Sequence, residues 1–332
     1  MNVQERIDLL SELGNHLRSG SPEWQESKRK ACLQNSWFTP KFINLAVTNI
    51  CAEFLDHRKL ELWASRYNLG NELSEKTIGL VMPGNIPLVG FHDFVSVFIS
   101  GHRLLAKPSA KDETLIRYIR DWIASKYKAM ASRLTFGEML KNCDAYIATG
   151  SNNSFRYFEY YFGRFPHIIR RNKTSIAILS GAESQDNLYD LASDICSYFG
   201  LGCRNVTHIM VPEEYDFIPL LDSLNRFGHF IDHNKYKNNF DYQLALLILN
   251  NRRYMTNGSV ILTENASFHS PISVLFYDHY HHLSEAVQLA NASDEIQCIV
   301  GKDHMPFGTT QSPSLGEYAD GVDTLLFLSG LG

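Results

Sequence analysis

The fold class of this chain follows from Thr77-Ile78-Gly79-Leu80-Val81-Met82, a short β-rich run that ends in Pro83-Gly84. Similar runs, each predicted to be a strand, occur at 102–106, 145–148, 167–170 and 175–179. Predicted helices separate the first three strands, at 87–99, 113–133 and 136–141. Strands that alternate with helices indicate a parallel sheet, in which ligands bind at the carboxyl ends of the strands.

Two further regions complete the predicted organisation. Residues 1–75 carry apolar side chains at helical spacing and are expected to form a helical N-terminal region. The alternation of helices and strands resumes near residue 187 and predicts a second α/β domain. We therefore expect a helical region at 1–75, an α/β domain at 76–182 and a second α/β domain at 183–332.

Composition narrows the class of protein. The 332 residues, 44% of them hydrophobic, suffice for a sizeable core and two domains. The net charge of −5 gives no basic field for nucleic acid. Six scattered cysteines without a Cys-x-x-Cys pair fit a reducing compartment better than disulfides or a metal site. The N-terminus is charged and amphipathic, and no apolar run approaches the ~20 residues of a membrane span. We therefore expect a soluble, cytoplasmic protein.

The candidate nucleophile lies in the segment Tyr198-Phe199-Gly200-Leu201-Gly202-Cys203-Arg204-Asn205. Glycines before a cysteine let the backbone turn tightly and let a ligand approach closely. The positive charge of Arg204 favours the thiolate, which is the nucleophilic form. The alternative is that Cys203 is a small buried hydrophobe, as most free cysteines are.

Three segments that follow predicted strands are candidate binding elements. In Met82-Pro83-Gly84-Asn85-Ile86-Pro87, the Asn85 amide could donate to a developing oxyanion, or Asn85 is simply a helix N-cap before Pro87. Lys107-Pro108-Ser109 could hold a ribose or phosphate, or Lys107 is a solvated surface lysine. Thr149-Gly150-Ser151 could receive a pyrophosphate, or Ser151 caps an ordinary turn. No Gly-x-Gly-x-x-Gly or P-loop sequence is present.

Two other clusters are interpreted as structural. Asp278-His279-Tyr280-His281-His282 lacks accompanying metal ligands at a familiar spacing, so we expect a polar loop and no metal site. The aromatic run at 155–162 could stack on bases, but without a basic field around it core packing is the preferred interpretation.

Taken together and in this order, these segments resemble the aldehyde dehydrogenase superfamily, and most closely its LuxC-type acyl-CoA reductase (fatty acyl reductase) branch. The resemblance covers roughly residues 75–330 and rests on 82–87, 107–109, 149–151, 200–205, 307–311 and 318–323. It implies an aldehyde dehydrogenase-like fold, with a Rossmann-like cofactor domain and a second, catalytic α/β domain. Because that cofactor domain lacks the usual glycine fingerprint, the resemblance also explains why none is found.

By resemblance, Cys203 maps to the nucleophile and Asn85 to the oxyanion asparagine. Lys107 maps to the lysine at the adenosine ribose, and Gly150-Ser151 to the pyrophosphate turn. The full predicted cofactor-binding set is Met82, Pro83, Gly84, Lys107, Ser109, Lys111, Thr149, Gly150, Ser151 and Gly181.

Two departures from the superfamily pattern carry further predictions. Where members that bind NAD often place a glutamate on the ribose 2′-hydroxyl, this chain has Ala110 followed by Lys111, which favours NADPH, with NADH as the alternative. The strand before Gly181 lacks the glutamate with which hydrolytic members activate water, although Glu183 is near in sequence. A cofactor-ribose glutamate in the second domain is not assigned, because the spacing of Glu264 to Phe268 does not match the superfamily.

The resemblance thus predicts an enzyme that reduces an acyl thioester, of coenzyme A or an acyl carrier, to the aldehyde through an acyl-Cys203 intermediate. The alternatives are an aldehyde dehydrogenase that acts oxidatively, a cofactor-free cysteine acyltransferase or thioesterase, and a nucleotide-binding protein without catalysis. Members of the superfamily usually pair, so a homodimer is also expected.

Overall fold

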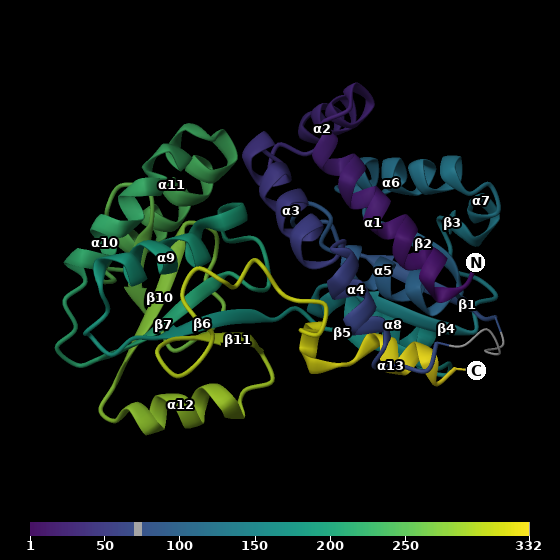
Figure 1. The fold of residues 1–332 in the computed structure, drawn as a ribbon. Helices are drawn as coiled ribbons and strands as arrows, with labels where there is room; N and C mark the ends of the chain where they lie inside the picture. The colour runs from purple at the N-terminus through teal and green to yellow at the C-terminus, as the bar shows by residue number, and fades with distance from the viewer. Residues whose placement is uncertain (70–74, 332) are drawn as a thin grey trace. The chain divides into compact units, whose positions relative to one another are not determined.

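The computed structural model describes residues 1–69 and 75–331, which form two compact units. The first unit comprises residues 1–172 together with the tail from Ser312, and the second comprises residues 173–311. Each unit contains its own sheet (Figure 1).

The sheet of the first unit has five parallel strands in the order β3-β2-β1-β4-β5. Their bounds are β1 Thr77–Met82, β2 Arg103–Pro108, β3 Leu134–Phe136, β4 Ala145–Thr149 and β5 His167–Arg170. This order is that of a doubly wound sheet, in which β2 and β3 lie on one side of β1 and the later strands β4 and β5 lie on the other. The carboxyl ends of β1 and β4 are therefore the expected place for a nucleotide.

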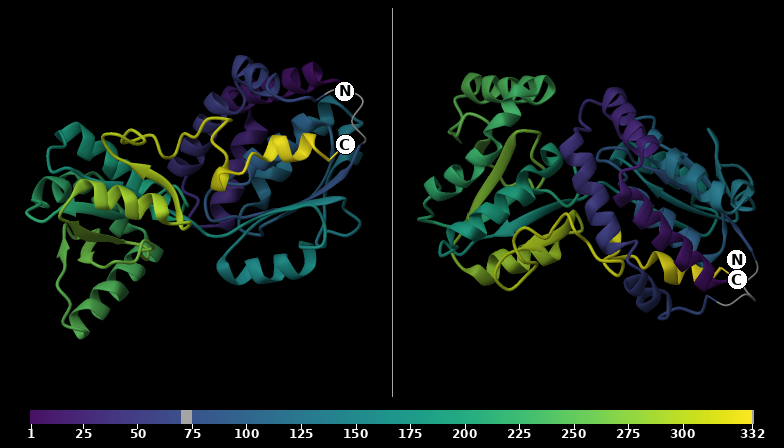
Figure 2. Two further views of the ribbon diagram at one scale, coloured as in Figure 1. Left: turned by 90° about the horizontal axis from the view of Figure 1, so that it is seen from below. Right: turned by 45° about the horizontal axis from the view of Figure 1, so that its top comes forward.

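Helices cover both faces of this sheet. The helix α8 lies on the opposite face from α1, α5 and α13 (Figure 2). The bounds are α1 Val3–Ser19, α2 Pro22–Gln34, α3 Pro40–Glu53, α4 His57–Ala64, α5 Phe91–Ser100, α6 Glu113–Lys126, α7 Met130–Arg133, α8 Asn152–Phe162 and α13 Thr324–Ser329. Local sequence sets several helix starts: Ser21 accepts a hydrogen bond from the Trp24 N–H while Pro22 occupies the first turn.

The first four helices share one hydrophobic core with the sheet. Leu10 and Leu13 of α1 and Leu60 of α4 belong to the same buried cluster as Ile78 of β1 and Leu325 of α13. Burial of such side chains contributes roughly 1.5–3 kcal/mol each. The helical N-terminal region is therefore part of the first unit.

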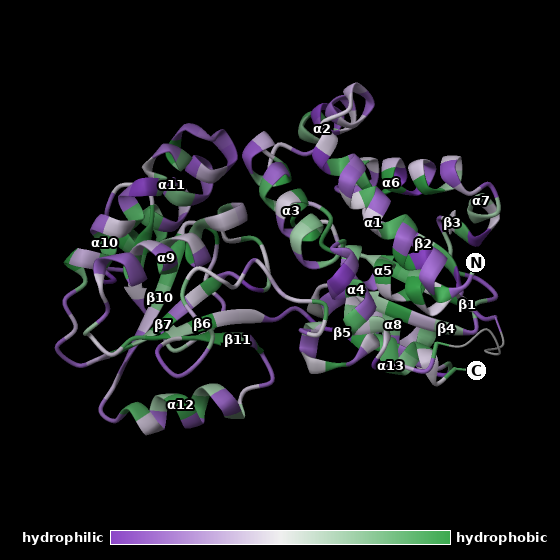
Figure 3. Cartoon of the chain, in the orientation of Figure 1, coloured by the Kyte–Doolittle hydropathy of each residue, from purple (hydrophilic) through white to green (hydrophobic). Residues whose placement is uncertain are grey.

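The sheet of the second unit has the order β11-β6-β7-β10-β9-β8, parallel except for the β8–β9 pair. The strands are β6 Thr174–Ile178, β7 Val206–Pro212, β8 Met255–Thr256, β9 Ile261–Glu264, β10 Val274–Tyr280 and β11 Ile296–Val300. The α-helices are α9 Gln185–Cys196, α10 Ile218–Leu224, α11 Asn234–Leu249 and α12 Leu283–Ala292. Along α12, hydrophobic and hydrophilic residues alternate (Figure 3), and Ala286 and Ala290 pack against β6 and β7.

The structure differs from the sequence predictions in several places. The chain divides after Asn172 and not near residue 182, because strand β6 pairs with β7 and β11 of the second unit; residues 70–74, beside the predicted boundary at 75, lie outside the described residues. The predicted helix at 136–141 is absent and Leu134–Phe136 forms the edge strand β3. The helix predicted from residue 87 begins only at Phe91.

Among the described residues, no helix is long and apolar enough to cross a membrane.

Candidate active site

Three predicted cofactor segments lie on neighbouring strands of the first unit. In the centre, Val81 of β1 pairs with Lys107 of β2 on one side and with Ala148 of β4 on the other. The residues that follow, Met82 to Asn85, Lys107 to Ser109 and Thr149 to Ser151, therefore emerge at the same edge of the sheet. This is the carboxyl edge, where doubly wound sheets bind their ligands.

The loops after β1 and β2 are packed directly against each other. The Ser109 N–H donates to the Met82 carbonyl at 3.0 Å, and the Ser109 Oγ accepts from the Lys111 N–H at 3.3 Å. A Cβ atom at Gly84 would lie 2.7 Å from the Cβ and Oγ of Ser109, so only glycine fits there. Lys107 and Lys111 remain exposed at this edge, where they can meet a phosphate or ribose.

The loop that carries Asn85 is held by a residue that sequence reasoning missed. Leu88 has a positive φ of 56°, and its N–H donates to the Asp112 carboxylate at 2.6 Å. Burial raises the pKa of Asp112 well above its usual value, and its Oδ1 has no hydrogen-bond partner among the described residues. A strained leucine has no sequence signature. Gly90 precedes the first turn of α5, so the interpretation of Asn85 as an N-cap of that helix is wrong; its oxyanion role stays a prediction.

The turn after β4 begins α8. The Ser151 side chain accepts a hydrogen bond from the Ser154 N–H, which confirms Ser151 as the helix cap. A Cβ atom at Gly150 would lie 2.8 Å from the Phe158 ring and 2.9 Å from the Ser154 Cβ. The turn therefore requires glycine, and its role toward pyrophosphate stays a prediction.

In the second unit, the Cys203 turn starts with strained backbone. Between α9 and β7 the chain passes through a 3-10 turn, Ser197–Gly200, in which Tyr198, Phe199 and Gly200 have φ angles of 54°, 58° and 74°. Left-handed conformations cost of order 1 kcal/mol for residues other than glycine. The buried Phe199 ring packs in tilted geometry against the rings of Phe230, His233 and Tyr236, and this packing offsets the strain.

The turn is closed by the fully buried side chain of Asn205. Its Oδ1 accepts from the Gly202 N–H at 2.8 Å, and its Nδ2 donates to the Asp194, Ile195 and Ser197 carbonyls at 2.9, 3.3 and 2.8 Å. The amide thereby satisfies carbonyls at the end of α9 while it fixes the backbone on both sides of Cys203. Asn205 is thus a structural element of the turn.

Cys203 is half-buried, whereas Cys51, Cys143, Cys196 and Cys298 are buried. Its carbonyl accepts a hydrogen bond from the Ser175 Oγ at 3.1 Å. The Arg204 Nη1 lies 3.5 Å from the Cys298 Sγ, so part of this guanidinium contacts a different sulfur from the one expected. Burial raises the pKa of Cys51 to about 11 and also raises the pKa of Cys196, so both of these thiols stay protonated at neutral pH.

The tail segment 307–311 is anchored to the same helix. The buried Asp194 carboxylate accepts hydrogen bonds from the Gly308 N–H at 2.7 Å and from the Thr310 N–H and Oγ1 at 3.2 and 2.7 Å. The segment on which the resemblance partly rests is therefore held by Asp194, whose own carbonyl accepts a hydrogen bond from Asn205 of the Cys203 turn. An aspartate among the apolar positions of α9, between Leu191 and Ile195, is the signal that sequence reasoning could have used.

Gly181 is not brought to Cys203. Ser175 pairs with Val206 at the amino end of β7, beside the Cys203 turn, whereas Gly181 lies beyond the carboxyl end of β6 at Ile178. The nearby Glu183 carboxylate accepts from the Ser180 and Gly181 N–H groups at 2.6 and 3.0 Å and closes its own turn.

The structure differs in part from the interpretation of both clusters: Asp278, His279 and Tyr280 belong to strand β10, so the predicted polar loop is wrong for these residues. His279 hydrogen-bonds the Pro212 carbonyl and His281 lies 3.0 Å from Glu213; no metal-binding group of three or more ligands occurs within 1–69 and 75–331. The prediction that the aromatic run at 155–162 packs in the core is wrong in part. Tyr157, Tyr160 and Tyr161 on α8 are exposed by 67, 80 and 60%, because every third or fourth residue of this helix faces the sheet and the tyrosines do not.

The fold of this chain occurs in proteins of known structure. No family model and no curated protein matches the sequence. Solved structures do match: aldehyde dehydrogenase 21 from Physcomitrella patens, in complex with the reaction product succinate, is 12% identical with a TM-score of 0.67, over 91% of this chain and 74% of its own. The chain has the aldehyde dehydrogenase fold.

Other aldehyde dehydrogenases agree. An NAD-dependent benzaldehyde dehydrogenase from Corynebacterium glutamicum is 13% identical with a TM-score of 0.67, over 91% of this chain and 77% of its own. An aldehyde dehydrogenase from Bacillus cereus in complex with NAD+ is 13% identical with a TM-score of 0.61, over 89% and 70%. The predicted fold class is confirmed. At these identities the likeness concerns the fold, and the LuxC-type branch stays a prediction.

Proposed function

We propose that this protein is a nicotinamide-dependent oxidoreductase that reduces an acyl thioester to the aldehyde, with Cys203 as nucleophile. The observation that carries the proposal is the half-buried Cys203 in a turn that strained backbone and the buried Asn205 amide hold in place. Such a turn, in a chain with the aldehyde dehydrogenase fold, supports a reactive cysteine over a structural one.

In the proposed reaction, the Cys203 thiolate attacks the thioester carbonyl. The oxyanion accepts hydrogen bonds from the Asn85 side-chain amide and the Cys203 N–H, each worth roughly 3 kcal/mol in comparable sites. The carbon–sulfur bond of the donor breaks, the donor leaves as a thiolate, and the acyl group stays on Cys203. When bound, the nicotinamide supplies a hydride to this acyl carbon. Collapse releases the aldehyde and returns the Cys203 thiolate.

The residues after β1, β2 and β4 fit a dinucleotide. Gly84 and Gly150 sit where a Cβ would clash, and the exposed Lys107 lies on the neighbouring strand β2 at the same sheet edge. In the proposal, Met82, Pro83, Thr149 and Ser151 line the cofactor, and Lys107 binds the adenosine ribose. Ala110 leaves room for a 2′-phosphate that Lys111 and Ser109 attract, so NADPH is proposed over NADH.

The proposal is tested by NADPH oxidation in the presence of acyl-CoA thioesters. Cys203→Ala should abolish turnover and also the covalent acyl label that mass spectrometry detects after a single turnover. Cys32→Ala, at the other half-buried cysteine, is the matched control and should keep both. An acyl label that persists in Cys203→Ala would refute the assignment.

Two further arms separate the related hypotheses. Turnover of an aldehyde with NADP+ that does not require coenzyme A would favour an oxidative aldehyde dehydrogenase. Thioester cleavage without NADPH would favour an acyltransferase or thioesterase. Lys111→Ala should raise the KM for NADPH about tenfold and leave that for NADH unchanged, if Lys111 contacts the 2′-phosphate.

The acyl donor in the proposal is a thioester of coenzyme A or of an acyl carrier protein, and the protein pairs as a homodimer. Parallel assays with acyl-CoA and acyl carrier protein identify the donor. Sedimentation equilibrium measures the assembly.

A further inference from the structure

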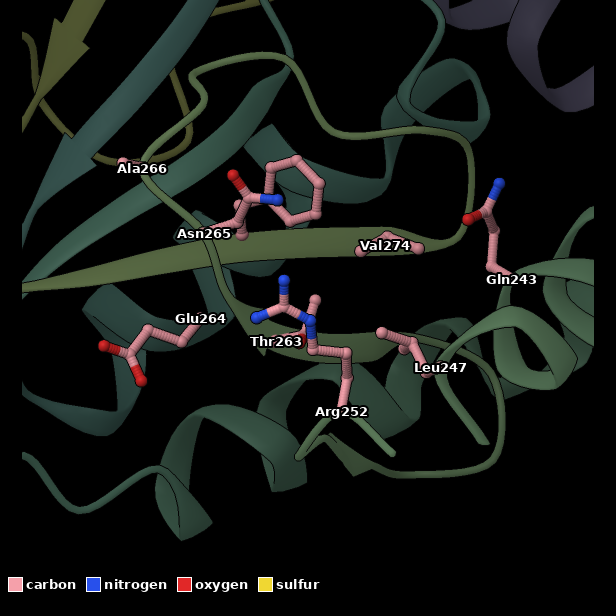
Figure 4. A pocket seen from close by; sticks show the side chains of 9 residues that line it. Gln243, Leu247, Arg252, Thr263, Glu264, Asn265, Ala266 and Val274 are labelled. Carbon is pink, nitrogen blue, oxygen red and sulfur yellow. The ribbon is translucent and has the colours of Figure 1, made fainter. Parts of the chain in front are cut away.

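A pocket of about 420 Å³ opens in the second unit between α11 and strands β9 and β10 (Figure 4). Its apolar wall consists of Leu247, Val274 and Phe276. Polar side chains line the remainder: Gln243, Arg252, Thr263, Glu264 and Asn265. None of these residues has a role in the reaction proposed above, and Glu264 lies at the carboxyl end of β9, whereas Cys203 precedes the amino end of β7.

Arg252 is the positively charged side chain that lines the pocket, and Glu264 is the negatively charged one. The Arg252 N–H closes the end of α11 on the Leu247 carbonyl at 2.9 Å, which fixes where the side chain begins. Within the part of the chain that the structure describes, its guanidinium has no ion pair and no hydrogen bond. The guanidinium extends toward Thr263 and Asn265, while the Glu264 carboxylate points away from it (Figure 4). Arg252 therefore presents its donors to the pocket.

The apolar wall is continuous with the core. Val274, only 8% exposed, belongs to the cluster with Phe240 and Ile261, on which Leu247 and Phe276 pack. The Thr263 hydroxyl already donates to the Arg253 carbonyl at 2.9 Å. The hydrogen-bond donors left for a ligand are thus mainly the Arg252 guanidinium and the side-chain amides of Gln243 and Asn265, beside an apolar surface.

We propose that this pocket binds a monocarboxylate with an apolar body, such as a medium-chain fatty acid. The carboxylate pairs with the guanidinium of Arg252, whose planar fork matches two carboxylate oxygens. The apolar body covers Leu247, Val274 and Phe276. An inorganic anion would leave that wall exposed, and an alcohol would leave the charge of Arg252 without a partner.

The test is calorimetric titration of the full-length protein with octanoate, octanol and inorganic phosphate. Octanoate should bind saturably, and at least tenfold more tightly than either of the others, because only octanoate supplies both charge and apolar area. Equal binding of octanol and octanoate, or no saturable binding of octanoate up to about 10 mM, would overturn the proposal.

Variants locate the ligand. Arg252→Gln should weaken octanoate at least tenfold. Arg253→Gln is the matched control, because Arg253 is exposed next to Arg252 but does not line the pocket. Ala266→Trp should block the pocket and abolish binding. Equal loss in both arginine variants would overturn the proposal. Cys203→Ala should bind octanoate normally, so this result is separable from the outcome at Cys203.

Discussion

At the level of single residues, the Cys203 turn depends on the amide of Asn205. The residue is inaccessible to solvent and joins the Gly202 N–H to three carbonyls at the end of α9. A buried polar network of this kind is stabilising only while each member keeps its partner. The sequence predicted the position of Cys203 in a turn, but gave no reason to single out Asn205.

Asn205→Ala is expected to lower the free energy of unfolding by about 2–4 kcal/mol, because buried carbonyls and the Gly202 N–H lose their partner. It should also change the rate at which iodoacetamide modifies Cys203. Urea titration and alkylation kinetics measure both effects. Asn250→Ala is the control, since the exposed Asn250 also donates to a helix carbonyl, that of Leu246. An equal loss of stability in the two variants would contradict this role.

Asp194 makes stability depend on pH. Burial raises its pKa from 3.8 to about 6, although hydrogen bonds from Thr310 and Gly308 lower it. The folded state then binds the proton more tightly than the unfolded chain. This contribution to the free energy of unfolding is therefore complete below pH 3.8 and lost as the pH rises through about 6. The loss amounts to about 3 kcal/mol.

Asp194→Asn should remove this pH dependence. Compared with the parent protein, the free energy of unfolding of the variant should rise by about 3 kcal/mol between pH 4 and pH 7. Denaturant titrations across this interval measure the difference. Asp186→Asn, at an exposed site of the same helix, should follow the parent protein. If the free energy of unfolding of Asp194→Asn changed with pH in the same way as that of the parent protein, the Asp194 carboxyl would not have the raised pKa.

At the level of helices and strands, a buried ion pair joins three elements of the first unit. The Arg170 guanidinium, at the end of β5, lies 2.7 Å from the Asp93 carboxylate of α5 and 2.7 Å from the Thr324 hydroxyl of α13. The arginine is only 3% exposed. Sequence analysis did not single out Arg170, because its partners lie far away along the chain.

Asp93→Ala is expected to lower the free energy of unfolding by about 3–5 kcal/mol, because it leaves the buried Arg170 charge without its counter-ion. The exposed Lys237–Asp241 pair is the control, and Lys237→Ala should cost less than about 1 kcal/mol. Thermal unfolding of both variants is the measurement. Similar melting temperatures in the two variants would mean that Arg170 finds another partner.

Element prediction from sequence worked where the signal was local. Strands β1 and β5 were predicted with the bounds that the structure has. The three-residue strand β3 was missed, because a segment this short shows no period of its own and is extended only by pairing with β2. The orientation of α8 was also misjudged, because aromatic content alone does not say which helix face meets the sheet.

At the level of the complete chain, the tail returns to the first unit. Tyr318 accepts from the Trp63 Nε1 at 2.7 Å and shares a hydrogen bond with Tyr67, whose hydroxyl donates to Asp323. Leu325 and Leu328 are fully buried in the core of that unit. The first unit is therefore incomplete without residues that follow the second unit in sequence.

A chain that ends at Gln311 should lose the cooperative unfolding of the first unit, because it exposes the core beneath α13. Circular dichroism and hydrogen exchange should show the loss in residues 1–172. The segment 173–311, expressed alone, should fold, because it contains every strand of its sheet. Native-like exchange protection of residues 1–172 in the shortened chain would contradict this prediction.

The sequence by itself determined the α/β class, most of the strands and the turn that contains Cys203, because apolar periodicity, glycines and prolines act over a few residues. Tertiary structure alone decided the strand order, the division after Asn172 and the return of the tail. It also placed Gly181 and Cys203 at opposite ends of paired strands. These features depend on contacts between residues far apart along the chain, and such contacts leave no local pattern to read.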